Sequence, residues 1–153
     1  MNNKWSFSLI CWLITLLIVV MVMLPIYNQV ADSYRFYFEN IVFIVLFLTF
    51  TRFIFLTKHH WFSHVTWFKT IAIFAVIPLL FYCVDNMWDF QRFLDEEGIG
   101  TILTDSYSKN QSYLGKYIKA QMIFFGASAL ITSFLLPFRM LHSIWRVKHR
   151  GKV

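Results

Sequence analysis

The sequence predicts an all-α integral membrane protein, a four-helix bundle that crosses a bilayer four times. Hydrophobic residues make up 58% of the chain and charged residues only 14%, whereas about one residue in four is charged in a soluble domain. Four long runs contain almost no charge. They lack the alternating pattern of a barrel strand, and backbone groups in lipid must be satisfied within the protein. We therefore expect each run to be an α-helix.

A single transmembrane domain is expected over residues 1–153, with spans at about 7–26, 40–57, 66–88 and 119–138. About 20 apolar residues cover the roughly 30 Å hydrocarbon core of a bilayer, and the first and last runs reach about that length without an internal charge. No small-residue cleavage site follows the first run, which is therefore expected to be a retained anchor. In the second run, Arg52 lies near enough to the end to lift its guanidinium into the headgroups.

The third span is the least regular of the four. Only residues 70–84 are uncharged, which is short for a crossing. The helix is expected to continue past Asp85 into the outer loop at 85–118, and Gly98 is a candidate for its terminator. Pro78 lies in the middle of this span and removes a backbone donor, which predicts a kink.

The distribution of charge predicts the orientation. With a cytoplasmic N-terminus, all eight acidic residues fall outside, whereas nine of the fourteen Lys and Arg residues fall inside, five of them in the basic cytoplasmic tail at 139–153. The positive-inside rule then gives an N-in/C-in topology. We expect a multi-pass protein of a bacterial inner (cytoplasmic) membrane. The same rule accounts for the net charge of +6, so nucleic acid is not expected as a partner.

The sharpest polar feature is a candidate outer polar cluster of Glu39, Asp85, Asp89 and Arg92. Asp85 and Asp89 are four residues apart and share a helical face. Glu39 lies near them if the second and third spans pack together. Carboxylates at membrane depth are costly and often mark a cation or proton pathway. The simpler interpretation, which the sequence favours, is that they are solvated where the helix leaves the bilayer.

The fourth span has unusually small side chains, which predict a helix-packing face at Gly126, Ala129 and Ser133. Small residues allow helix backbones to approach closely in lipid. The sequence leaves open whether this face packs within the bundle or against another subunit.

The tail combines apolar residues with the basic residues Arg139, Arg146, Lys148 and Arg150. This pattern is typical of an interfacial helix, and anionic lipid headgroups attract basic residues near the surface by about 1 kcal/mol each. A topology signal explains the same charges, and we favour that interpretation.

Histidines on the predicted cytoplasmic side include His60 and His64, whose spacing suits a pair of metal ligands. Because that side has no acidic residue and its cationic surroundings disfavour a dication, histidines without a metal are the favoured interpretation. No span contains a histidine for haem, and the chain has no GxSxG, HExxH, phosphate-loop or CxxC motif. We therefore expect no catalytic residue, cofactor or metal.

The function that these patterns favour is a small non-enzymatic multi-pass subunit that assembles, stabilises or anchors a larger membrane complex. Its expected partners are the lipid bilayer, other membrane subunits in a hetero- or homo-oligomer, and anionic headgroups at the tail. The alternative is a small oligomeric transporter or channel with an acidic outer mouth at Glu39, Asp85 and Asp89. A third possibility is a lipid-modifying enzyme that uses the histidines and Arg139 at the inner interface.

Overall fold

The described residues of the computed structural model are 2–30, 34–55, 66–103 and 111–149. They form four long α-helices and one short 3-10 helix, in the order α1 (Asn2–Val30), α2 (Tyr37–Phe55), α3 (Thr66–Glu96), η3 (Ile99–Leu103) and α4 (Gln111–His149). The all-α prediction is confirmed. Of the candidate residues, His60, His64 and Arg150 lie outside the described residues.

Each long helix contains a stretch that is long and apolar enough to cross a membrane. These stretches are Ser6–Val30, Tyr37–Phe55, Thr70–Glu96 and Ser112–Arg146. The length and the apolar composition expected of four membrane-spanning helices are confirmed. All four helices extend beyond the expected spans at one end or both, because the helical conformation continues into polar sequence that hydropathy alone assigns to loops.

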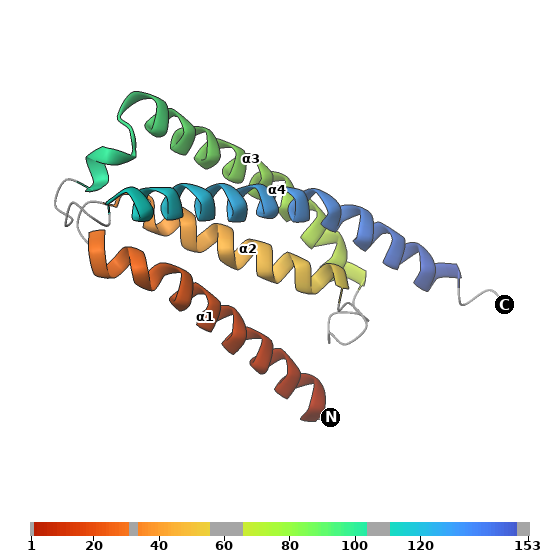
Figure 1. The fold of residues 1–153 in the computed structure, drawn as a ribbon. Helices are drawn as coiled ribbons and strands as arrows, with labels where there is room; N and C mark the ends of the chain where they lie inside the picture. Colours follow the sequence, from red (N-terminus) through yellow and green to blue (C-terminus); the bar gives the residue numbers. More distant parts are fainter. Residues whose placement is uncertain (1, 31–33, 56–65, 104–110, 150–153) are drawn as a thin grey trace.

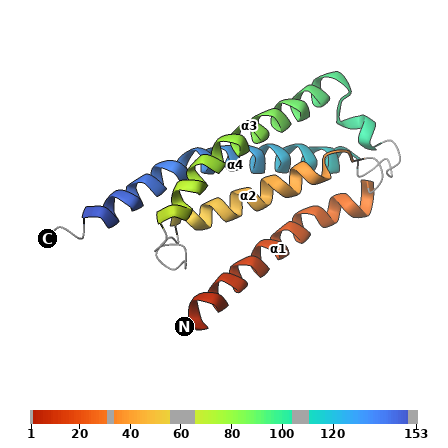
Figure 2. The same cartoon turned by 180° about the vertical axis from the view of Figure 1, so that it is seen from behind.

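The α4 helix is the centre of the fold, because it packs closely along both α2 and α3. Figure 1 shows α1 and α3 running in one direction and α2 and α4 in the other. The start of α1 and the end of α4 therefore lie at the same end of the molecule. In both views, α1 meets the other helices near its C-terminal end and diverges from them toward its start (Figures 1 and 2).

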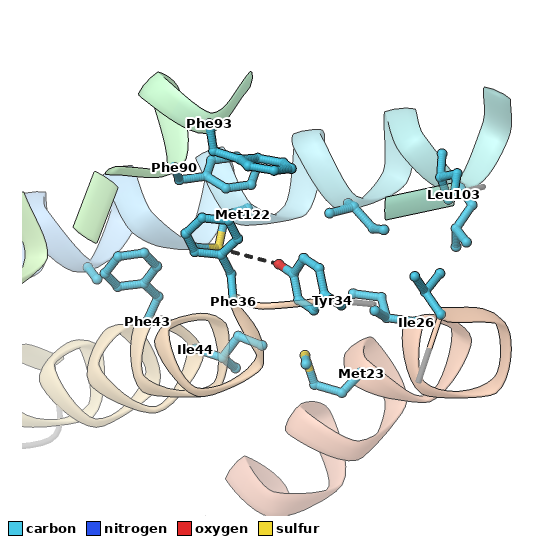
Figure 3. Packing of buried hydrophobic residues seen from close by; sticks show 14 of the residues in the cluster. Met23, Ile26, Tyr34, Phe36, Phe43, Ile44, Phe90, Phe93, Leu103 and Met122 are labelled. Carbon is cyan, nitrogen blue, oxygen red and sulfur yellow. Dashed lines mark hydrogen bonds between the residues drawn. The ribbon is translucent and has the colours of Figure 1, made fainter. Parts of the chain in front are cut away.

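Aromatic side chains just before α2 join the helices at one end. The ring centroids of Phe36 lie 5.3 Å from those of both Phe90 and Phe93 on α3. The hydroxyl of Tyr34 points at the sulfur of Met122 on α4, at 4.0 Å (Figure 3). These contacts insert the segment before α2 between α3 and α4, where edge-to-face aromatic pairs add to the packing energy.

The small-residue face of α4 lies inside the bundle. Gly126 is buried, and a Cβ atom added there would collide with the Met87 side chain of α3. Ala129 and Ser133 have no exposed surface. Of the two possibilities that the sequence left open, this structure has the contact within the chain, and the missing side chain at Gly126 lets α3 approach α4 closely.

The predicted extension of α3 is present, and the helix runs to Glu96. Its end is closed by Gly98 in a left-handed conformation (φ 75°), with the Gly98 amide donating to the Phe93 carbonyl over 3.1 Å. Glycine adopts this conformation without the cost that a Cβ imposes. Pro78 lies within α3, and Figures 1 and 2 show the helix changing direction after its first turns.

We predict that Gly126→Leu destabilises the protein, because the added side chain has to displace Met87. Overpacking of this kind costs about 1–3 kcal/mol. Thermal unfolding in detergent, followed by circular dichroism, should show a lower midpoint, and adding Met87→Ala should recover part of the loss. Ala120→Leu on the exposed face of α4 is the matched control. Equal midpoints for the two leucine variants would contradict the packing.

Candidate functional site

The α3 helix has two opposite faces. Its buried face carries Val76, Cys83 and Phe90, which recur every seven residues and have at most 2% exposure. Its exposed face carries large apolar side chains at alternating steps of three and four residues, namely Phe74, Ile77, Phe81, Val84 and Trp88. This second spacing is the one that helices use to pack side by side. Within the described chain, nothing covers this exposed face.

Three of the four residues of the predicted outer polar cluster lie on this exposed side of α3. Asp85, Asp89 and Arg92 are all exposed. Glu39 lies in the first turn of α2 and differs from them, because it is half-buried and its Oε2 atom is buried without a hydrogen-bond partner. The three α3 residues therefore share the exposed side of that helix, whereas one carboxylate oxygen of Glu39 is buried in the bundle.

The contact between α3 and α4 places these charges along the apolar part of the bundle. Met87 packs on Gly126, which is seven residues beyond Lys119 and therefore about 10 Å into the uncharged run at 120–138. Asp85 and Asp89 flank Met87 by two residues on either side. Both carboxylates thus lie level with a stretch of α4 that is expected to be within the hydrocarbon core.

This register changes the interpretation of the two aspartates. Carboxylates that are simply solvated where α3 leaves the bilayer would lie at the level of Lys119 or farther from the centre of the membrane. A charged side chain that faces lipid at membrane depth is costly, and such groups normally face other protein or a polar cavity. Arg92 is one turn from Asp89 and can offset one of the two negative charges. The exposed face of α3 therefore keeps a net negative charge.

Buried polar side chains that the sequence interpretation missed lie on α2, on α4 and in the segment before α2. The Asn40 side-chain amide donates to the Tyr34 hydroxyl over 3.2 Å. Burial raises the pKa of Tyr34 above its ordinary value of about 10, so the phenol stays protonated. The Oδ1 atom of Asn40 and both polar side-chain atoms of Gln121 on α4 are buried without partners. Uncharged polar residues within apolar runs are the sequence signal for such a group.

At the other end of the bundle, two arginines hold helices together. Arg52 donates from Nη2 to the Ser8 hydroxyl on α1 over 2.7 Å. Arg139 donates from Nε to the Ile54 carbonyl over 3.0 Å, where a cation complements the negative end of the α2 dipole. Both side chains were expected at lipid headgroups, and both have partners within the chain.

The other residues predicted to contact lipid headgroups lie in the last turns of α4 or after them. This helix continues unbroken from the fourth span to His149, and the Arg146 side chain is exposed. The side chain of Lys148 is outside the described set. Among the described residues, no group of three or more His, Cys, Asp or Glu side chains is placed to hold a metal ion.

Comparison of the chain with protein-family models, with curated proteins and with solved structures finds no match.

We predict that Tyr34→Phe destabilises the fold, because it removes the acceptor of the buried Asn40 amide. An unsatisfied buried donor costs about 1–3 kcal/mol. The unfolding midpoint in detergent should fall for this variant and stay unchanged for Tyr113→Phe, whose side chain is 77% exposed. If the two substitutions have the same effect, the hydrogen bond does not contribute to stability.

Proposed function

We propose that this chain is a non-enzymatic membrane subunit that assembles, stabilises or anchors a larger membrane complex. The observation that supports the proposal is that Asp85 and Asp89, on the exposed face of α3, lie level with the uncharged run of α4. Lipid cannot satisfy a carboxylate at that depth. A helix of another protein that covers this face, and that offers a basic or hydrogen-bonding side chain at the same level, removes the cost.

The apolar side chains of α3 also favour a partner helix on this face. Phe81, Val84 and Trp88 are each more than half exposed, and they alternate with the two carboxylates along one side of the helix. In lipid, close packing and interhelical polar contacts drive association, since apolar burial alone gives little advantage over lipid tails. A partner helix gains packing from the apolar residues and specificity from the charges.

This proposal predicts a position-dependent contact in native membranes. A photo-crosslinking amino acid in place of Val84 should give one discrete protein adduct, whereas the same amino acid in place of Ile131, which is 60% exposed on α4, should not. The combination of Asp85→Asn and Asp89→Asn should reduce the adduct about tenfold, which corresponds to a loss of roughly 1.4 kcal/mol.

The matched control is the combination of Glu96→Gln and Glu97→Gln, which neutralises two exposed carboxylates at and just past the end of α3. It should leave the adduct at the level of the unmodified sequence. Adducts of equal yield at Val84 and Ile131, or an adduct that the aspartate variant does not change, would contradict the proposal.

The second candidate is a small oligomeric transporter or channel with an acidic outer mouth. The specific observation in its favour is the buried and unpartnered Oε2 atom of Glu39, since carboxylates of this kind take part in cation or proton pathways. In this case the exposed face of α3 packs between copies of the chain. The two candidates differ in whether the purified chain alone moves a solute.

For the transporter, purified protein in sealed vesicles should conduct protons or monovalent cations above the rate of protein-free vesicles. Glu39→Gln should lower that rate at least about tenfold if the carboxylate lies on the pathway, and Glu97→Gln should not. A rate equal to that of empty vesicles, or one that Glu39→Gln leaves unchanged, rejects this candidate.

A further inference from the structure

A cleft opens between the last turns of α3, η3 and the first half of α4. Its volume is about 500 Å³, and its lining residues are Gln91, Leu94, Asp95, Ile99, Lys119 and Ile123. Three of them are apolar and line it from three different elements. The other three supply an amide, a carboxylate and an ammonium group. This cleft lies nearer the C-terminal end of α3 than Asp85 and Asp89, and neither aspartate lines it.

The two charges of the cleft face it from different helices. Asp95 belongs to α3 and Lys119 to α4, and both are exposed. Neither forms an ion pair with another residue of the described chain. A ligand that carries one negative and one positive group can therefore bind both side chains at the same time.

The depth of the cleft indicates where that ligand comes from. Lys119 directly precedes the uncharged run at 120–138, so the polar part of the cleft lies at the expected level of the lipid headgroups. Ile123 is one turn further into that run, and its side chain lines the apolar part of the cleft.

We propose that this cleft binds a zwitterionic phospholipid whose headgroup ends in a primary ammonium, as in phosphatidylethanolamine. Lys119 pairs with the phosphate, and Asp95 accepts hydrogen bonds from the ammonium. Gln91 supplies a further donor to the phosphate or glycerol oxygens, and the start of the acyl chains lies against Ile123 and Leu94. Charge-assisted hydrogen bonds at both ends of one headgroup give selectivity that a single lysine cannot give.

The choice of headgroup follows from the donors it offers. A choline headgroup carries the same charges but has no N–H group for Asp95 to accept. A glycerol headgroup is anionic and leaves Asp95 without a cation. This inference goes beyond the proposed function and does not depend on it, because the cleft and the exposed aspartates of α3 are different surfaces.

The test is native mass spectrometry of the full-length chain after delipidation in detergent. Phosphatidylethanolamine, phosphatidylcholine and phosphatidylglycerol with identical acyl chains are added back separately. The ethanolamine lipid should be retained at least about fivefold better than either of the others, as expected for hydrogen bonds to charged groups. Equal retention of the three lipids by the unmodified chain would overturn the proposal without any variant.

Two substitutions and two controls locate the site. Asp95→Asn should abolish the preference over phosphatidylcholine, and Lys119→Gln should weaken the binding of all three lipids. Glu97→Gln and Lys116→Gln change exposed charges that do not line the cleft, and they should have no effect. Preference that survives both cleft variants, or full competition by soluble glycerophosphoethanolamine at equal concentration, would contradict a phospholipid site here.

Discussion

The close approach of α3 to α4 at Met87 and Gly126 sets the register on which the rest of the structure depends. With no side chain at Gly126, the sulfur of Met87 occupies space that any larger residue would fill. Once this pair is fixed, Asp85 and Asp89 lie level with the apolar part of α4, whereas Asp95 lies across the cleft from Lys119. The polar partner inferred for α3 and the lipid inferred for the cleft both follow from this one contact.

The α2 helix packs along α4, whereas α1 is attached to the bundle largely by polar bonds. Tyr117 of α4 donates to the Val22 carbonyl of α1 over 3.0 Å, and Tyr37 of α2 donates to the Val30 carbonyl over 3.3 Å. The latter bond satisfies one of the orphan carbonyls at the end of α1. Because most of α1 remains exposed, these bonds, the Arg52–Ser8 hydrogen bond near its start and the buried residues near its C-terminal end keep it in the bundle.

Much of the fold could be predicted from the sequence, because the bilayer allows so few solutions for a long apolar run. The four helices and the end of the third at Gly98 follow from hydropathy and from helix-terminating residues. The central place of α4 could not be predicted, since hydropathy does not say which helices are neighbours. For the same reason the expected proximity of Glu39 to Asp85 depended on which helices are neighbours, and Glu39 is half-buried whereas Asp85 is exposed.

Asp85, Asp89 and Arg92 could be named from the sequence, whereas their level relative to α4 could not. Counting the charges at Asp85 and Asp89 as the exit of the third span suggested solvated side chains, because a single helix carries no information about depth relative to its neighbours. The buried Asn40 and Gln121 were missed because neutral amides hardly change the mean hydropathy of a run. Both features depend on how neighbouring helices pack, which the hydropathy of a single span does not show.

Thiol accessibility measures the depth of α3 in the membrane. Single cysteines replace Asp85 and Glu97 in the full-length chain, and a membrane-impermeant maleimide is added to permeabilised membranes. Of the two native cysteines, Cys83 is buried and Cys11 is half-buried, and the unmodified chain gives the background labelling. We expect Glu97→Cys to be labelled rapidly. The labelling rate of Asp85→Cys should be at least about tenfold lower, because water is absent at its depth. Equal labelling at the two positions would contradict the register and the inferences drawn from it.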